Sequence, residues 1–264
     1  VVINGGTVNA TRRYAAGIGG GSSSAGEVTI TGGDITAKGG GLGAGIGSGQ
    51  KSSTGTTINI SGGKITAANT RALTSDGGGA GIGGGQNSTG TIINISGGEI
   101  DATGGICGAG IGGGYGANGF GNDITITGGL VKAVSQKGSG IGPGYYSGTE
   151  DVAEEKLTIE NSPFIFANSG SGGMEKGIYK QDGSENWSNI ISIDGSDGKV
   201  YGKSVTTAMD FEIAEDQTLV VPEGTTLAVG EGKTITNKGT IKVVGTMDSA
   251  GADKVTGNKP KYKL

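Results

Sequence analysis

The sequence predicts an all-β fold, a right-handed, single-stranded parallel β-helix with about 30 residues in each three-strand coil. One observation is a Gly-Ile-Gly motif that recurs with its isoleucine at positions 18, 46, 82, 111 and 141. A second is an Ile-x-Gly-Gly signature that lies between these copies and begins at positions 3, 30, 60, 95 and 126. Such a period is typical of solenoids, in which each repeat packs on its neighbours.

Each repeat divides into three short segments, and each segment has the pattern of a strand. In the second repeat they are residues 28–31, 35–37 and 44–46, where apolar residues alternate with polar residues or glycine. Alternation at period two is typical of half-buried strands, and the intervening glycines allow the positive φ angles of corners. We therefore expect three strands per coil, with equivalent strands stacked in parallel about 4.8 Å apart.

The three faces of the predicted coil differ in their outward residues. Inward positions form aliphatic ladders, in which Ile60 and Ile95 should lie directly above one another. Outward positions on the first face are Thr and Asn, and the second face presents Asp34, Lys64 and Glu99 in a column of alternating sign. The third face presents glycine, a bare backbone surface that indicates tight winding or the close approach of another group.

The pattern changes along the chain, although we expect a single β-helix domain over residues 1–264. Residues 1–147 hold the regular repeats, and residues 148–210 read as degenerate coils with longer loops. Over residues 211–247 the apolar pairs start only about 8 residues apart, which predicts tighter terminal coils. Residues 248–264 have weak periodicity and are expected to be a cap or a tail.

Composition excludes several classes of protein. A net charge of −4 without a basic block speaks against nucleic acid as a partner, and no apolar run approaches a membrane span. The absence of histidine removes the usual general base and the commonest transition-metal ligand. The one cysteine, Cys107, excludes an internal disulfide and is expected in the core.

Two motifs suggest ligands but have simpler interpretations. Residues 108–113 satisfy the G-x-G-x-x-G dinucleotide fingerprint, yet no helix is expected to follow, and near-copies occur in the other repeats. Asp194 and Asp197 flank Gly-Ser and resemble part of an oxygen-rich calcium loop. We favour an ordinary Asp-Gly turn there, with calcium as the alternative, and expect no other cofactor.

Two further activities of β-helices are disfavoured. A polysaccharide lyase or hydrolase needs carboxylates gathered on one face, whereas the acids here are dispersed along the sequence. An ice-binding face needs a regular threonine array, which Asn59 and Asn94 interrupt. We therefore expect a protein that is not an enzyme, with ice binding less favoured than the functions considered below.

Aromatic residues gather at one corner of the later repeats and mark the candidate ligand site. They follow the Gly-Ile-Gly strand in consecutive coils and are Tyr115, Phe120, Tyr145, Tyr146, Tyr179 and Trp187. The nearby acids are Asp123, Glu150, Asp151, Asp182 and Glu185. Rings offer flat apolar faces to sugar C–H groups, and carboxylates accept hydrogen bonds from hydroxyls. The alternative is a packing cluster of rings that covers a wider coil.

The repeat units resemble a known class of proteins. The sequences INGGTV…AAGIGGG, ITGGDITA…GAGIGSG and ISGGEIDA…GAGIGGG resemble the glycine-rich repeats of large surface proteins of anaerobic gut bacteria. The tail from residue 216 to 243 resembles stretches of the same class, so the similarity covers roughly residues 1–147 and 211–246. It implies β-helical adhesins or carbohydrate-binding modules that are exported and act outside the cell, at its surface.

The sequence thus predicts a non-enzymatic, extracellular surface module that binds a glycan or a host ligand, or acts as an adhesin. The alternative is a purely structural stalk or spacer of a larger surface protein. Val1 begins within a strand and no polar cap precedes it, so we expect either end-to-end self-association or further residues upstream.

Overall fold

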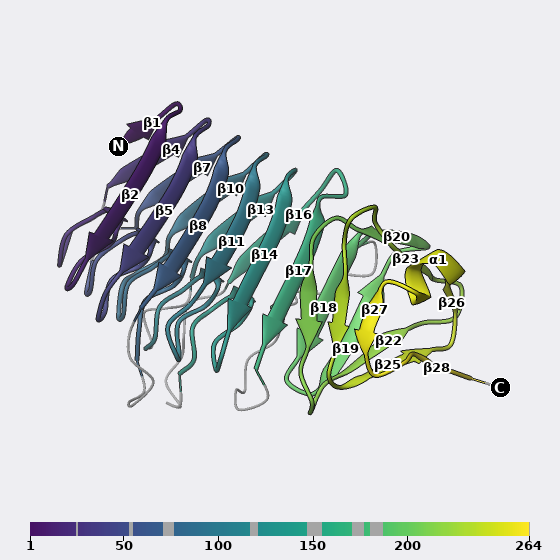
Figure 1. Cartoon of the computed structure of the whole chain (residues 1–264). Coiled ribbons are helices and arrows are strands. Elements are labelled where there is room, and N and C mark those ends of the chain that lie inside the picture. Colours follow the sequence, from purple (N-terminus) through teal and green to yellow (C-terminus); the bar gives the residue numbers. More distant parts are fainter. Residues whose placement is uncertain are drawn as a thin grey trace.

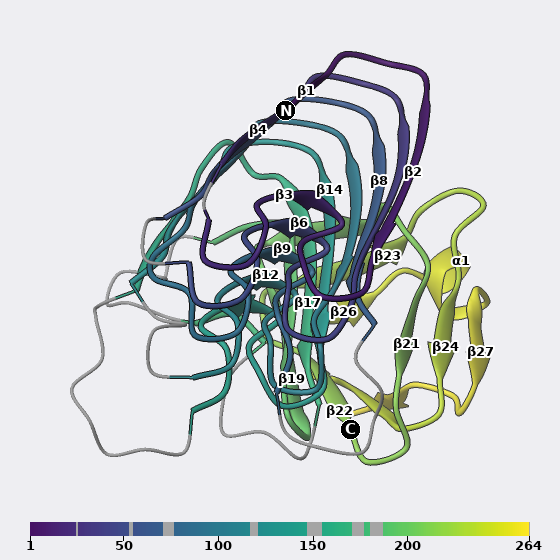
Figure 2. The same ribbon diagram turned by 90° about the vertical axis from the view of Figure 1, so that its left-hand side faces the viewer.

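The chain winds into stacked coils of short strands, as the computed structural model shows for residues 1–24, 26–52, 55–70, 77–116, 121–146, 155–170, 177–179 and 187–263 (Figure 1). Seen from the N-terminal end, the first coils run clockwise as they recede from the viewer (Figure 2). This is the right-handed winding expected of parallel strands joined by crossover connections. The predicted parallel β-helix is confirmed.

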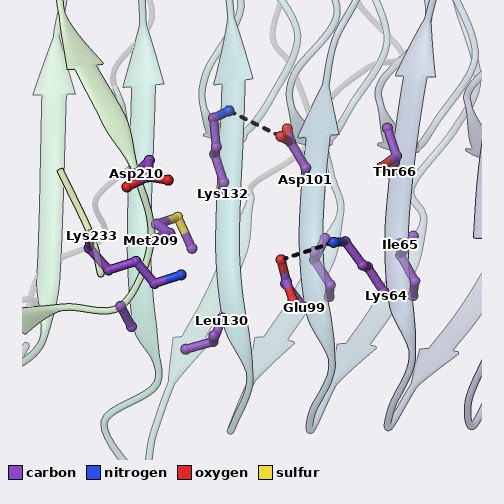
Figure 3. Close-up of a pocket in the computed structure, with 12 residues that line it drawn as sticks. Lys64, Ile65, Thr66, Glu99, Asp101, Leu130, Lys132, Met209, Asp210 and Lys233 are labelled. Atoms are coloured by element: carbon purple, nitrogen blue, oxygen red, sulfur yellow. Dashed lines mark hydrogen bonds and ion pairs between the residues drawn. The ribbon is translucent and has the colours of Figure 1, made fainter. Parts of the chain in front are cut away.

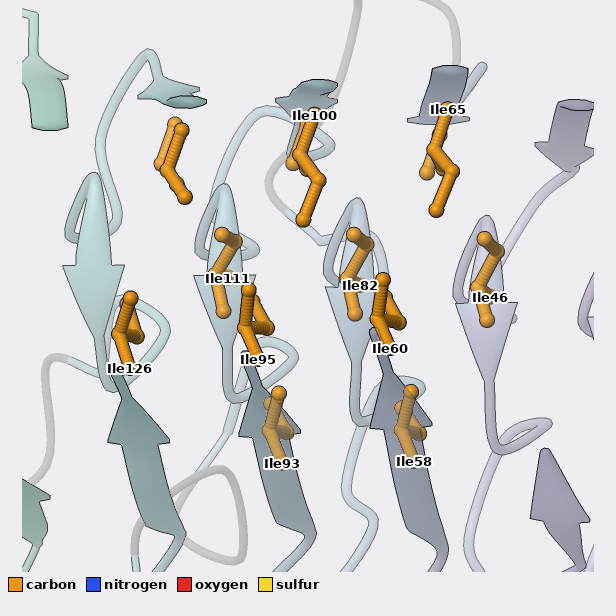
Figure 4. Packing of buried hydrophobic residues seen from close by; sticks show 14 of the residues in the cluster. Ile46, Ile58, Ile60, Ile65, Ile82, Ile93, Ile95, Ile100, Ile111 and Ile126 are labelled. Atoms are coloured by element: carbon orange, nitrogen blue, oxygen red, sulfur yellow. The ribbon is translucent and has the colours of Figure 1, made fainter. Parts of the chain in front are cut away.

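The first sheet contains the opening strand of each long coil, and its inward columns are aliphatic. Its strands pair in parallel, so that Ile58, Ile93 and Ile124 share one column. Ile60 pairs with Ile95 as predicted, and both side chains are buried (Figure 4). The six strands, in spatial order, are β1 (Val2–Ile3), β4 (Glu27–Ile30), β7 (Thr57–Ile60), β10 (Ile92–Ile95), β13 (Asp123–Ile126) and β16 (Lys156–Ile159).

The third face of the long coils forms a narrow sheet from the Gly-Ile-Gly repeats. The isoleucines stack in register and are buried, with Ile46, Ile82 and Ile111 pointing toward the other two faces (Figure 4). The five strands, in chain order, are β3 (Ile18–Gly19), β6 (Ile46–Gly47), β9 (Ile82–Gly83), β12 (Ile111–Gly112) and β15 (Ile141–Gly142).

The glycines of the third face are closely approached by another part of the chain, which is one of the two possibilities that the sequence left open. Gly81 is buried, and a Cβ atom built on it would lie 2.7 Å from both the Gly110 oxygen and the Thr103 nitrogen. Gly45 makes the equivalent approach to Ala68. The group that approaches these glycines is therefore the backbone of the chain's own second face, against which only glycine fits.

The second face belongs to one long sheet that runs through the whole molecule. In spatial order, its eleven strands are β2 (Thr7–Arg12), β5 (Asp34–Gly39), β8 (Lys64–Asn69), β11 (Glu99–Thr103), β14 (Leu130–Ser135), β17 (Phe164–Ser169), β18 (Ile190–Asp194), β19 (Asp197–Tyr201), β22 (Thr218–Val221), β25 (Thr240–Val243) and β28 (Lys261–Tyr262).

The direction of the strands reverses once within the long sheet. We expected parallel pairing throughout, but β18 and β19 are antiparallel, with Asp194 opposite Asp197. The two residues between them make the turn, and Gly195 has φ 62° at the first central position, where two-residue hairpin turns favour glycine. The expectation of uninterrupted parallel stacking was therefore wrong at this hairpin.

The side on which the core lies also changes at this point. In β17, Ile165 and Ala167 face the core of the long coils, whereas Phe164 and Phe166 face a second core on the other side of the sheet. Val200 on β19 belongs to this second core as well. Because both the strand direction and the side of the core are reversed, the winding hand of the coils stays the same.

The second core is enclosed by three coils of about 20 residues, which begin with β19. Their other two faces are three-stranded sheets, and the short helix α1 (Ser249–Ala252) lies in the last coil. One sheet holds β20 (Ser204–Thr207), β23 (Thr226–Val229) and β26 (Thr246–Met247). The other holds β21 (Phe211–Ile213), β24 (Ile235–Asn237) and β27 (Val255–Gly257).

Candidate functional site

The chain thus forms two β-helices: the long coils around the first core are the first helix, and the shorter coils around the second core are the second helix. Because they lie on opposite faces of the long sheet, an inward-facing corner is left on each side of it. On the side of the first core, that core ends near β18, and the outer face of β19 and β22 continues beyond it. On the opposite side, the second core begins against β17, next to the outer face of β14 and β11. Each corner holds a groove.

Three of the aromatic residues predicted from the sequence follow the Gly-Ile-Gly strands of neighbouring coils. Tyr115 and Tyr145 belong to neighbouring coils, since the Gly116 N–H donates to the Tyr145 carbonyl at 3.3 Å. Both rings are half-buried, and the Lys137 ammonium lies 6.0 Å from the centre of the Tyr145 ring. Tyr146 is half-buried next to Tyr145 in sequence. These residues belong to the edge formed by the corners of the long coils.

The remaining predicted residues lie in the next coil, on the first sheet or outside the described part of the chain. Tyr179 is half-buried and donates its N–H to the Ile141 carbonyl at 2.9 Å, which places it beside β15, the last of the Gly-Ile-Gly strands. Asp123 forms an ion pair with Lys156 across two strands of the first sheet. The predicted residues outside the described part of the chain are Phe120, Glu150, Asp151, Asp182 and Glu185.

Trp187 pairs with a ring that the sequence analysis did not single out. Its ring contacts that of Tyr201 edge to face, with centroids 5.6 Å apart and planes at 69°. Both side chains are half-buried and pack against the last residues of the first core, which they cover. The sequence pattern that could have identified this ring is the alternation of Lys199, Val200 and Tyr201. In a strand it places the ring of Tyr201 on the face opposite Val200.

A groove of about 570 Å³ opens beside this pair of rings. One wall is the end of the first helix, and the other is the turn after β22. The Lys199 ammonium lies over the Tyr201 ring at 5.1 Å from its centre, a cation–π distance. The groove is lined by Trp187, Ser188, Lys199, Val200, Tyr201, Gly202, Lys203 and residues 222–225. It combines exposed charges with ring surface, which is the mixture found in small-ligand sites.

The corner on the opposite side holds a smaller, strongly charged groove of about 320 Å³ (Figure 3). We expected the acids to be dispersed, but here Glu99 and Asp101 of β11 face Asp210 of the second helix. Lysines bind two of these carboxylates: Lys132 lies 3.0 Å from Asp101, and Lys64 lies 3.9 Å from Glu99. Two of the three acids thus have a lysine partner within the chain, and Asp210 accepts a hydrogen bond from the Thr234 N–H at 2.7 Å.

Asp194 and Asp197 form the ends of the hairpin turn, and the interpretation of this motif as an Asp-Gly turn is confirmed. One oxygen of Asp194 accepts hydrogen bonds from the Gly177 N–H at 2.6 Å and the Ser192 hydroxyl at 3.0 Å. Among the described residues no group of three or more acidic or cysteine side chains gathers in a way that could hold a metal ion. The carboxylate of Asp194 thus has a structural role in the hairpin.

Comparison with known proteins supports the architecture. A family model described as a β-helix repeat matches residues 1–22, 28–50, 93–115 and 124–145, all within the long coils. No curated protein and no solved structure gives a significant match to the chain. The chain is therefore similar to β-helix repeat proteins, and the family description names no activity. No helix among the described residues is long and apolar enough to cross a membrane.

Proposed function

We propose that the chain is an extracellular carbohydrate-binding module, with the groove beside Trp187 and Tyr201 as its binding site. The observation that carries the proposal is an aromatic pair at the wall of an open groove, next to exposed charged side chains. A sugar ring can place its C–H face on an aromatic ring while its hydroxyls bond to Lys199 and Glu223.

The proposed function is binding rather than catalysis. In the charged groove on the opposite side, Asp101 and Glu99 form ion pairs with lysines of neighbouring strands. Glycoside cleavage requires two carboxyl groups that reach the scissile bond, whereas Glu99 and Asp101 are engaged with lysines of the chain. This supports a module that holds a polysaccharide at the cell surface, as an adhesin does.

A structural stalk is the second candidate, and a specific observation favours it. The aliphatic ladders and the buried glycine face repeat from coil to coil, and the strands of successive long coils stack side by side along the molecule (Figure 1). A stack of this kind separates the domains at its two ends. The two functions are compatible, because the groove lies at the junction with the second helix and not on the regular coils.

The test is retention of the 264-residue chain on immobilised polysaccharides from plant, bacterial and host sources. We expect Trp187→Ala and Tyr201→Ala to lower retention at least tenfold on the polysaccharide that the native chain binds. Tyr14→Ala removes a ring that is 71% exposed at the far end of the molecule, and it should leave retention unchanged. Thermal melts of each variant separate lost binding from lost folding.

If the native chain is retained on none of the polysaccharides, the binding proposal fails and the stalk remains. If Tyr14→Ala lowers retention as much as Trp187→Ala does, the binding surface is not this groove. If both groove variants bind normally, the rings are not the binding site, and a lowered melting temperature would show that they serve to cover the core.

A further inference from the structure

A column of lysines begins at the proposed groove and runs along the outer face of the second helix. In the long sheet Lys199 pairs with Val220, Val220 pairs with Lys242, and Lys242 pairs with Lys261. Parallel strands lie about 4.8 Å apart, so the three ammonium groups can form a line across β19, β22, β25 and β28. Lys199 also lines the groove, which makes the column continuous with it.

The column carries positive charge that its surroundings do not neutralise. Lys199, Lys242 and Lys261 are exposed, although the whole chain has a net charge of −4. Within residues 187–263, all of which are described, no ion pair involves any of the three. Among the described residues, the acids near this face include Asp194 and Asp197 at the hairpin, where Asp194 accepts hydrogen bonds from Gly177 and Ser192, and Glu223 at the groove. Further lysines lie close in sequence, at Lys203, Lys259 and Lys263.

Elsewhere among the described residues, several lysines form ion pairs with acids of a neighbouring coil. Lys64 pairs with Glu99, Lys132 with Asp101, and Lys238 with Glu212. By contrast, Lys242 and Lys261 occupy adjacent strands in direct register. Like charges directly opposite each other destabilise a sheet, and a bound anion relieves this repulsion. The unmatched column therefore indicates an anionic ligand.

We infer that the ligand is an anionic polysaccharide, one that carries carboxylate or sulfate groups, and that it lies from the groove along the lysine column. This inference rests on the proposed carbohydrate-binding function and adds the chemical class of the glycan. One sugar packs against Trp187 and Tyr201, and the acidic groups of the following sugars pair with Lys242 and Lys261.

The shape of the site favours a polysaccharide over other polyanions. The Trp187 and Tyr201 rings are half-buried in an inward-facing corner, which the flat surface of an anionic membrane cannot enter. The column is a single lysine wide, so it matches a linear chain with regularly spaced charges. Anionic lipid surfaces and single-stranded nucleic acid are tested as competing ligands below.

The experiment measures the affinity of the native chain for polygalacturonate and for its fully methyl-esterified form, together with dextran sulfate and dextran. We expect each charged polymer to bind at least tenfold more tightly than its neutral counterpart, with a difference that shrinks as salt is raised. The double variant Lys242→Ala/Lys261→Ala should lose most of this difference. The control is Lys38→Ala/Lys51→Ala, which removes two lysines from the first helix and should leave the affinities unchanged.

The outcomes separate this inference from the proposed function. If Trp187→Ala abolishes binding of all polymers but the lysine variant binds like the native chain, the groove binds glycans and the anionic assignment is wrong. If the lysine variant loses dextran sulfate while Trp187→Ala retains it, the column binds anions without the groove, and the proposed function fails. Equally tight, lysine-dependent binding of oligothymidylate or phosphatidylserine vesicles would overturn the assignment to a polysaccharide.

Discussion

The two helices of this molecule reach a closed core by different means. In the first helix a coil encloses isoleucine and alanine, and its third face is glycine pressed against the backbone of the second face. In the second helix the coils are shorter, and the core contains Phe166, Phe211 and Leu219 among other large residues. The comparison shows that a β-helix can fill its interior either with backbone or with larger side chains.

The function that we propose depends on the offset between the two helices. Had the second helix continued on the same core, the outer face of the long sheet would have no corner and Trp187 would have no groove beside it. Because of the reversal at β18 and β19, one face of the long sheet covers the core of the first helix, and the other face covers the core of the second. It thereby creates a grooved corner on each side of the long sheet.

The largest expected effect comes from placing a charge in the core of the first helix. Ile95→Asp buries a carboxylate without a partner, and it should lower the free energy of unfolding by several kcal/mol, about 3–5. Thr125→Asp lies on the adjacent strand, outward and half-buried, and should cost less than about 1 kcal/mol. Chemical denaturation measures both, and equal losses would mean that the assignment of the inward face is wrong.

A second substitution tests whether the two cores unfold together. Phe166 faces the second core and stacks on Phe211 with ring centroids 4.6 Å apart, so Phe166→Ala should cost about 3–5 kcal/mol. Trp187, the single tryptophan, lies at the end of the first core and reports on it by fluorescence.

Because β17 contributes to both cores, we expect fluorescence and far-UV circular dichroism to show coincident transitions in this variant. Ile165→Val, on the opposite face of the same strand, is the control and should cost about 0.5–1.5 kcal/mol. A fluorescence transition that stays at its native midpoint while the circular dichroism shifts would show that the helices unfold independently.

The difference in how the interiors are filled can be tested directly on the glycine face. Gly81→Ala places a Cβ 2.7 Å from two backbone atoms that cannot rotate away, so overpacking should cost about 1–3 kcal/mol. Gly5→Ala adds a methyl group where no atom lies within 4 Å and should be nearly neutral. If the two variants unfold at the same urea concentration, this face is not closely packed.

The sequence predicts the first helix well because every inward position is repeated. Ile60 and Ile95 could be paired in advance, since the same alternation returns in each coil and a shift by one residue would expose the whole ladder. The packing of the third face could not be read in the same way. A glycine position is compatible with an open surface or with a close backbone approach, and only the path of the other strands decides between them.

The reversal of the long sheet was missed although the sequence carries a signal for it. Phe164, Ile165, Phe166 and Ala167 are apolar without alternation, as are most residues from Ile190 to Ile193. Such runs are typical of strands buried on both faces. The rings of the candidate site could be found singly, but the pairing of Trp187 with Tyr201 requires the hairpin between them.

The smallest expected effect concerns the charged column on the outer face of the first helix, which contrasts with the lysine column of the second. Lys64 lies between Asp34 and Glu99 in register, and its side chain is 65% exposed. Lys64→Glu places three acids in adjacent strands, and at low salt it should cost up to about 1 kcal/mol. Lys64→Gln removes the ion pair without adding repulsion and serves as the control.

In 1 M salt the Debye length falls to about 3 Å, so the repulsion between the acids should be screened and the two variants should become equally stable. Urea denaturation at low and high salt measures this convergence. A difference between Glu and Gln that persists unchanged in 1 M salt would show that the column is held by packing rather than by charge. The alternating charges of Asp34, Lys64 and Glu99 would then contribute nothing to the free energy of unfolding. The contrast with the lysine column would have no electrostatic basis.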